Sequence, residues 1–207
     1  MKKYDNIIFD LGNVILNIDY LSTVKAFEKI GLKNARKMYS KSEQKKIFDR
    51  LETGQISGEQ FILEIQKIIP NATKSSIIKS WNAIIKDLPS SRLKILQKLK
   101  KKFKIFLLSN TNQIHIDHII NKLGKEKYKM FYHLFDKVYF SHEVKLRKPD
   151  YKIFKLVINE NDLEIKKTLF IDDSIQHINS ARKIGLHTYH LDEKKESLET
   201  IFPGIIQ

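Results

Sequence analysis

The sequence of 207 residues contains no cysteine. Disulfide bonds and thiolate metal sites are therefore excluded, and a reducing compartment is expected. No stretch approaches the roughly 18 consecutive apolar residues of a membrane-spanning helix. The short apolar run Ile7–Phe9 is interrupted by Asp10, unlike the longer apolar core of a signal peptide. We expect a cytoplasmic protein without a membrane partner.

Arginine is also scarce, since it occurs only at positions 36, 50, 92, 147 and 182, and lysine supplies most of the 38 basic side chains. The formal net charge is +14. Nucleic-acid-binding proteins usually combine basic residues with stacking aromatic residues or a recognisable module, and the sequence shows neither. We interpret the charge as a solvated surface that attracts anionic small molecules, and we expect no nucleic-acid partner.

The length fits one domain or a core with a small insertion, and the 42% hydrophobic content is that of an ordinary globular protein. From residue 17 to 88 the pattern is helical, because apolar residues recur at spacings of three to four, as in Phe61–Ile69. Gly31, Gly54 and Pro70 interrupt it, and Ser57 is a candidate N-cap. We predict an all-helical insertion over this range.

The rest of the chain alternates strand and helix. This pattern predicts an α/β core, a doubly wound, Rossmann-like parallel sheet formed by residues 1–16 and 89–207, with the helical cap 17–88 inserted after the first strand. No internal repeat or low-complexity linker is present. The predicted strands are 6–9, 104–108, 137–140, 168–171 and 187–190, and the predicted helices are 92–102, 114–123, 151–159 and 175–184.

Polar side chains follow several of these strands directly. Asp10 ends the first strand, Ser109 and Asn110 end the second, and the Asp172–Asp173 pair ends the fourth. Lys148 lies shortly after the third strand. Because ligands of such sheets bind beyond the carboxyl ends of the strands, we expect these side chains to form one site.

The composition of this site indicates phosphoryl transfer. Three carboxylates at one edge would repel each other without a cation, and hard oxygen ligands suit Mg²⁺. A lysine, a serine hydroxyl and backbone N–H groups would bind a phosphate. A carboxylate nucleophile would form an acyl-phosphate intermediate that water then hydrolyses.

Four segments resemble, in order, the motifs of the haloacid dehalogenase-like hydrolases: Phe9–Val14, Leu107–Asn112, Arg147–Asp150, and Phe170–Ser174 with Ala181–Gly185. The likeness covers nearly the whole chain, because the helical insertion stands at the family's cap position. The run Asp-Leu-Gly-Asn-Val with a paired Asp-Asp is similar to a subgroup of bacterial α-glucose-1-phosphate phosphatases and the phosphatase domain of soluble epoxide hydrolases.

The resemblance implies a Mg²⁺-dependent phosphatase with Asp10 as nucleophile. It implies Asp10, the Gly12 carbonyl and Asp173 as metal ligands, with Asp172 in support. Ser109, Asn110 and Lys148 would hold the phosphoryl group of a phosphorylated small molecule. The state of assembly would be a monomer or a homodimer.

One position departs from the family pattern. Most phosphatases of this family carry a second Asp two residues after the nucleophile as general acid, and here that residue is Gly12. General acids contribute about 10²–10⁴-fold to a rate. We therefore predict a preference for esters with good leaving groups, such as sugar 1-phosphates, or a proton donor from the cap. His177 replaces a more usual Asp or Asn, and it either assists the site or faces outward.

Three alternatives follow from the same residues. A haloacid dehalogenase shares the nucleophile but needs no metal, so the Asp172–Asp173 pair argues against it. A response-regulator receiver carries its acidic pair after the first strand and has no cap. A catalytically weakened scaffold that binds a phospho-ligand is favoured by Gly12.

Other polar residues carry less information. Asp19, Glu52 and Trp81–Asn82 are candidates for substrate contact from the cap, although a lone Trp on a helix is more often a core residue. His115 and His118 lie three residues apart without a third ligand, so we interpret them as packing or surface residues.

Overall fold

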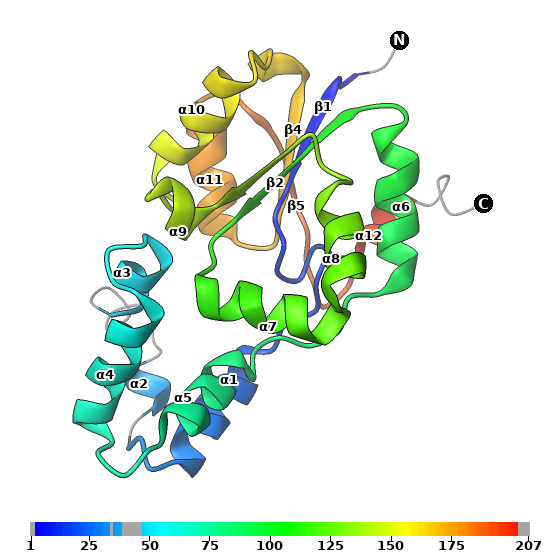
Figure 1. Ribbon diagram of the computed structural model, residues 1–207. Helices are drawn as coiled ribbons and strands as arrows, with labels where there is room; N and C mark the ends of the chain where they lie inside the picture. Colours follow the sequence, from blue (N-terminus) through cyan, green and yellow to red (C-terminus); the bar gives the residue numbers. More distant parts are fainter. Residues whose placement is uncertain (1–2, 34, 39–46, 203–207) are drawn as a thin grey trace.

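The computed structural model describes residues 3–33, 35–38 and 47–202 (Figure 1). A five-stranded parallel sheet lies at its centre, with the strand order β3-β2-β1-β4-β5. This confirms the predicted doubly wound α/β fold. The strands are β1 (Asn6–Phe9), β2 (Lys104–Ser109), β3 (Lys137–Phe140), β4 (Thr168–Asp172) and β5 (His187–His190).

The register of the sheet aligns the carboxyl ends of its central strands. Ile8 of β1 lies opposite Phe106 of β2 and Phe170 of β4. The Asp10 N–H donates to the Ile171 carbonyl at 2.9 Å, so the β1–β4 ladder continues past the end of β1. The chain passes from β1 to β2 and β3 on one side and places β4 and β5 on the other. Such a reversal of strand order is where open α/β sheets bind ligands.

Successive strand residues point to opposite faces of the sheet, and each face is covered by helices. Ile7 and Phe9 pack in one cluster with α6 (Ser90–Lys100), α7 (Gln113–Leu123), α8 (Lys125–Tyr132) and α12 (Leu198–Ile201). Ile8 packs in the other with α10 (Tyr151–Glu160) and α11 (Ile175–Lys183). The short α9 (Ser141–Val144) and η1 (Ile165–Lys167) lie in connecting segments. The sheet is thus buried on both sides, as its continuous apolar strands require.

Helix α8 was not predicted from the sequence. Its residues are mostly polar, and Phe131 is its one buried side chain. Gly124, which adopts a positive φ of 81°, separates it from α7. Helix α6 begins two residues earlier than predicted, directly after Pro89, which stands at its N-cap.

Between β1 and α6 the structure describes α1 (Tyr20–Lys29), α2 (Ala35–Met38), α3 (Phe48–Glu52), α4 (Gly58–Ile68) and α5 (Lys74–Asn82). We call this group the helical insertion. It lies on the side of the sheet where the strands end (Figure 1). Its core contains Phe27, Phe48, Phe61 and Trp81. Ser57 caps α4 as predicted, since its side chain accepts a hydrogen bond from the Gln60 N–H at 3.1 Å.

The helical insertion contacts the sheet-forming part of the chain at several points. The Trp81 ring stacks on His115 of α7, with ring centroids 4.8 Å apart. Gly54, with a positive φ of 63°, packs so closely against the His142 carbonyl that a side chain at this position would collide with it. Arg147 forms ion pairs with Asp49 and Glu52 of α3. These contacts hold the helical insertion over the edge of the sheet.

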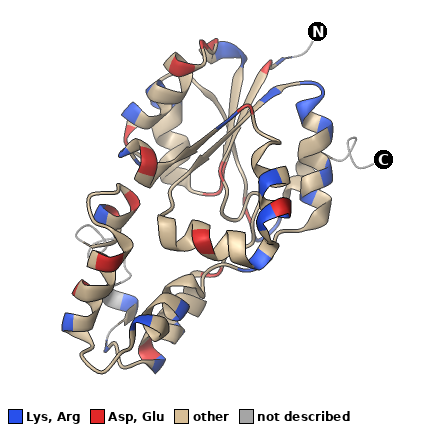
Figure 2. Ribbon diagram, in the orientation of Figure 1, with Lys and Arg blue, Asp and Glu red and all other residues tan. Residues whose placement is uncertain are grey.

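The surface charge is spread over both parts of the molecule. Figure 2 shows Lys and Arg on helices that flank the sheet and on helices of the insertion. Within the described ranges no helix combines the length and apolarity needed to cross a bilayer.

Candidate active site

Three carboxylates meet at the carboxyl edge of the sheet. Asp10 follows β1, Asp172 ends β4 and Asp173 comes next. One oxygen from each lies within 4.8 Å of the others. The strand register produces this meeting, because β1 and β4 are neighbours and end at the same level. The structure thus brings together the acidic residues that the sequence placed at one rim.

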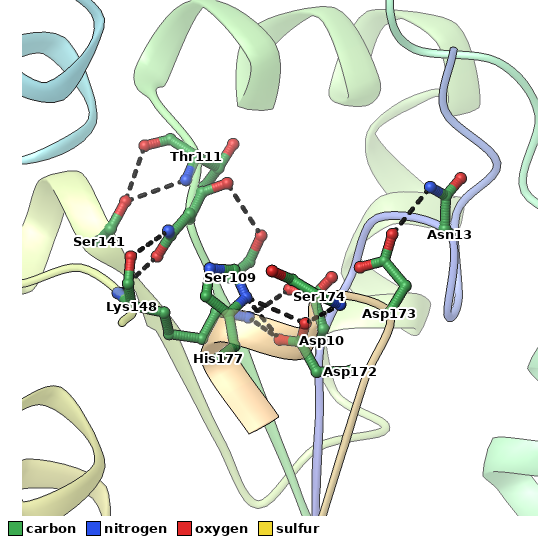
Figure 3. A network of polar contacts seen from close by, with 11 residues as sticks. Asp10, Asn13, Ser109, Thr111, Ser141, Lys148, Asp172, Asp173, Ser174 and His177 are labelled. Atoms are coloured by element: carbon green, nitrogen blue, oxygen red, sulfur yellow. Dashed lines mark hydrogen bonds and ion pairs between the residues drawn. The ribbon is translucent and has the colours of Figure 1, made fainter. Parts of the chain in front are cut away.

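Lys148 lies between two of these carboxylates (Figure 3). Its Nζ is 2.6 Å from Asp10 Oδ1 and 2.7 Å from Asp172 Oδ2, and the residue is fully buried. Burial alone lowers the pKa of a lysine, but Asp10 and Asp172 outweigh it and raise the pKa of Lys148. Lys148 therefore remains an ammonium ion at neutral pH.

The backbone of Lys148 is held by Asn110. The Asn110 side chain donates to the Lys148 carbonyl at 2.8 Å and accepts from the Lys148 N–H at 2.9 Å. The peptide bond from Lys148 to Pro149 is cis. The sequence suggested a phosphate contact for Asn110, and the structure uses its amide to fix the lysine. Periodicity gives no signal for this pairing, because it depends on the shape of the loop before α10.

Both carboxylate oxygens of Asp172 have hydrogen-bonding partners. Its Oδ1 accepts from the Ser174 N–H at 2.7 Å and lies 2.9 Å from His177 Nδ1, while Oδ2 faces Lys148. Burial favours a raised pKa for Asp172, but Lys148 and His177 lower it to about 2. His177 therefore faces the site, which decides between the two orientations considered from the sequence.

Asp173 has different surroundings from Asp172. Its Oδ2 accepts one hydrogen bond from the Asn13 side chain, at 2.9 Å. Burial, with Asp10 close by, raises the pKa of Asp173 to about 7. Asn13 adopts a left-handed φ of 55° in the turn after β1, a conformation that Asn tolerates better than most residues. The contact between Asn13 and Asp173 could not be predicted from the sequence.

The charge balance of the site fits a divalent cation. Burial and the neighbouring Asp172 raise the pKa of Asp10 against the opposing effect of Lys148. Asp10, Asp172 and Asp173 when ionised outnumber the single ammonium of Lys148, so negative charge is in excess. Carboxylate oxygens are the ligands that Mg²⁺ prefers, and a cation among them would relieve the repulsion. Among the described residues, these three carboxylates form the group suited to a metal.

Position 12, where the family pattern has a second Asp, is enclosed by an apolar side chain. A Cβ atom on Gly12 would lie 2.8 Å from Ile18 Cδ1 and 3.8 Å from Asp10 Oδ2. Ile18 thus fills the space that a side chain on residue 12 would enter. The Gly12 carbonyl accepts a hydrogen bond from the Val14 N–H at 2.7 Å, and a carbonyl oxygen has a second lone pair for a further partner.

Ser109, at the end of β2, is buried and borders the same site. The loop that follows is fixed by Ser141, whose hydroxyl accepts from the Thr111 N–H at 2.9 Å and donates to the Thr111 carbonyl at 3.0 Å (Figure 3). This contact ties the end of β2 to the start of α9.

A cavity of about 780 Å³ opens above these residues. Asp10, Ser109, Lys148 and Asp173 line its floor, and Tyr20, Glu52 and Trp81 of the helical insertion contribute to the opposite wall. Both parts of the chain therefore shape the space that a ligand would occupy.

The other residues considered from the sequence, Asp19, Asn82, His115 and His118, lie outside the acidic cluster. Asp19 caps α1 through the Leu21 N–H at 2.9 Å and does not line the cavity. Asn82 Oδ1 lies 2.9 Å from His115 Nδ1. Burial lowers the pKa of His115 to about 3, so this imidazole is neutral. It packs against the Trp81 ring and also borders the cavity. Burial also lowers the pKa of His118, although this residue is only partly enclosed.

Comparison with known proteins agrees with this geometry. A model of the haloacid dehalogenase-like hydrolases matches residues 4–185. D-ribitol-5-phosphate phosphatase from Bacteroides thetaiotaomicron is 29% identical over 185 residues, which cover 89% of this chain and 90% of that protein. A phosphorylated carbohydrates phosphatase from Thermotoga maritima is 23% identical, covering 93% of this chain and 89% of that protein.

Solved structures show the same fold. A family enzyme from Bacteroides thetaiotaomicron, crystallised with magnesium and inorganic phosphate, superposes with a TM-score of 0.84 at 31% identity, covering 96% of this chain and 99% of that one. A HAD-like family hydrolase from Porphyromonas gingivalis gives a TM-score of 0.84 at 26% identity, covering 98% of this chain and 96% of that one. With its four motifs, its sheet order and its acidic cluster compatible with Mg²⁺, the chain belongs to the haloacid dehalogenase-like hydrolases.

Proposed function

We propose that the protein is a Mg²⁺-dependent phosphatase that hydrolyses a phosphorylated sugar or polyol through an aspartyl-phosphate on Asp10. The observation that carries this proposal is the buried Lys148 ammonium, 2.6 Å from Asp10 Oδ1 on the floor of a cavity shared with the helical insertion. Phosphatases of sugar or polyol phosphates among the relatives support the substrate class. Residues 17–88 would act as the cap and the remaining residues as the core.

In the first step an Asp10 carboxylate oxygen attacks phosphorus. A P–O bond to Asp10 forms, the bond to the ester oxygen breaks, and the leaving alkoxide takes up a proton from water. In the second step water cleaves the acyl phosphate, which releases inorganic phosphate and restores the Asp10 carboxylate. Lys148 orients Asp10 and offsets the charge of the phosphoryl oxygens.

The remaining residues would have distinct tasks. Asp10, Asp173 and the Gly12 carbonyl would hold Mg²⁺, which neutralises phosphoryl oxygens when bound. Asp172, already occupied by Lys148, Ser174 and His177, would keep the ammonium in place. Ser109 would donate to the phosphoryl group, and Asn110 would assist by holding the backbone of Lys148.

The leaving group is the narrower part of the proposal. Since residue 12 carries no carboxyl, an ester whose alcohol is relatively acidic needs less help from a proton donor. We therefore retain a preference for sugar 1-phosphates, while the Bacteroides relative is named for a primary-alcohol ester. Equal kcat/KM on glucose 1-phosphate and glucose 6-phosphate would exclude this preference.

The main experiment compares wild type, Asp10→Asn and Asp117→Asn in a phosphate-release screen with Mg²⁺ or with EDTA. Asp117 lies on α7, where its carboxylate accepts from Gln113 at 2.8 Å, so its variant controls for the loss of a carboxylate elsewhere. We expect activity that requires Mg²⁺, is lost in Asp10→Asn and is kept in Asp117→Asn. Halide release in EDTA would favour the dehalogenase, and phosphate binding without turnover would favour the scaffold.

A further inference from the structure

The wall of the cavity opposite the catalytic carboxylates carries a second charged cluster. Helix α3 contributes Asp49 and Glu52, and the loop before α10 contributes Arg147. Arg147 Nη2 lies 2.9 Å from Glu52 Oε2, and Nη1 forms an ion pair with Asp49. All three residues line the cavity. We call them the α3 cluster.

The α3 cluster has more negative than positive charge. Two carboxylates face one guanidinium, so the positive charge of Arg147 is matched within the cluster and is not left for a ligand anion. Glu193, after β5, also lines the cavity and adds a further carboxylate. Lys148, the lysine of the cavity lining, is engaged by Asp10 and Asp172. Three histidines also line the cavity: His177 contacts Asp172 and His190 contacts the Asp173 carbonyl at the floor, while burial keeps His115 neutral. Positive charge in this cavity is thus concentrated at the floor.

The polar atoms of the α3 cluster are incompletely satisfied. Arg147 Nε is buried and has no hydrogen-bond partner, and Glu52 Oε2 meets Arg147 Nη2 in the ion pair without a further partner. Burial raises the pKa of Glu52 to about 7 against the opposing effect of Lys148, and the Arg147 guanidinium lies 2.9 Å from Glu52 Oε2. A carboxylate accepts from a hydroxyl group and repels a second anion, whereas a carboxylic acid donates to a hydroxyl group and carries no charge.

We propose that the α3 cluster recognises the hydroxyl groups of the leaving group, and that it selects phosphate esters of neutral polyhydroxy compounds against esters that carry a second anionic group. Hydroxyl groups supply donors to Asp49 and Glu52 and accept from Arg147. A carboxylate or second phosphate at the same place would face like charges, and such opposition discriminates between ligands. This inference rests on the proposed phosphatase function and names its substrate class.

The test uses a matched pair of substrates, sorbitol 6-phosphate and 6-phosphogluconate. Both have six carbons and a terminal phosphate, and they differ in whether the far end is a hydroxymethyl group or a carboxylate. We expect kcat/KM to be at least roughly tenfold higher on the neutral ester, since an unmatched anion opposes its neighbours. Equal values, or a preference for 6-phosphogluconate, would overturn the inference.

Glu52→Gln keeps the shape of the side chain and removes its charge. We expect this variant to reduce the discrimination between the two esters roughly threefold or more, mainly through a lower KM for 6-phosphogluconate. Glu59→Gln is the control, because Glu59 lies on α4 in an exposed pair with Lys74 and outside the cavity lining. An unchanged ratio in a folded Glu52→Gln protein contradicts the role of Glu52.

p-Nitrophenyl phosphate separates this inference from the function on which it rests. If Mg²⁺-dependent hydrolysis of this ester is absent, the phosphatase proposal fails. If it is present while the two six-carbon esters are hydrolysed equally, only the α3 cluster is misassigned. Asp49→Asn gives a second variant should Glu52→Gln unfold, with the same expected loss of discrimination.

Discussion

Replacing Gly12 by alanine places a methyl group where Ile18 already lies. The added Cβ would be 2.8 Å from Ile18 Cδ1, whereas carbon atoms in favourable contact are about 3.5–4.0 Å apart. Gly12 does not have a positive φ, so its backbone conformation is accessible to alanine. Alanine also reduces the conformational freedom of the unfolded chain, which stabilises the folded state by about 0.4–1 kcal/mol. Overpacking costs about 1–3 kcal/mol. We expect Gly12→Ala to lower the free energy of unfolding by about 1 kcal/mol.

Changing Ile18 to valine removes Cδ1, the atom that would collide. Ile18 is half-buried, so this change alone should cost near the lower end of the usual 0.5–1.5 kcal/mol, about 0.5 kcal/mol. In the Ile18→Val background the methyl group at position 12 has room, and Gly12→Ala should become neutral or slightly stabilising. The two changes are then coupled by about 1–2 kcal/mol.

Urea unfolding of wild type, the two single variants and the double variant measures this coupling. The midpoint and the slope are both needed, because a changed slope would indicate a changed denatured state. If the free energies of the two single variants add to that of the double variant within about 0.5 kcal/mol, Ile18 does not occupy the space of side chain 12. Steric exclusion by Ile18 would then not account for the missing carboxyl at this position.

Two further predictions concern the metal and pH. Mg²⁺ at 100 times its Kd should raise the free energy of unfolding of wild type by about 2.7 kcal/mol, and Asp173→Asn should remove most of this gain. Thermal unfolding measures both proteins, and an equal gain in the variant would contradict the assignment of Asp173 as a metal ligand. The pKa of His115 is about 3 in the folded protein and about 6.5 in the unfolded chain. Its contribution to the free energy of unfolding is therefore complete above about pH 6.5 and is lost as the pH falls towards about 3. Between pH 7 and pH 5 the free energy of unfolding of wild type should therefore fall by about 2 kcal/mol more than that of His115→Asn. If urea unfolding shows the same decrease for both proteins, the imidazole is not buried in its neutral form.

The sequence predicted the fold and the acidic part of the site because both follow from the strands. Apolar runs located the five strands nearly to the residue, and a parallel sheet brings their carboxyl ends to one edge. Asp10 and Asp172 could therefore be placed together although they lie far apart in the chain. Helix α8 was missed because its single buried side chain, Phe131, produces no periodicity.

Contacts made by loops could not be predicted in this way. The pairing of Asn110 with the Lys148 backbone, the direction of His177 and the ion pairs of Arg147 depend on loop conformations and on how the helical insertion lies over the sheet. The family resemblance implied a phosphate contact for Asn110. Lysine-rich composition alone does not distinguish buried lysines from exposed ones, and Lys148 was identified by its place after the third strand and by the motif Arg147–Asp150.

Arg147 and Lys148 are neighbours in the chain, but their side chains contact different parts of the molecule. The side chain of Arg147 reaches up to α3, and that of Lys148 reaches down between two carboxylates. Any rotation of α3 away from the sheet must either break the Arg147 ion pairs or pull on the peptide that carries Lys148. Asn110 anchors that peptide through two hydrogen bonds, whereas the Arg147 pairs are partly exposed and weaker. If α3 moved away from the sheet, the Arg147 ion pairs would therefore break first, and the Lys148 ammonium would keep its place between Asp10 and Asp172.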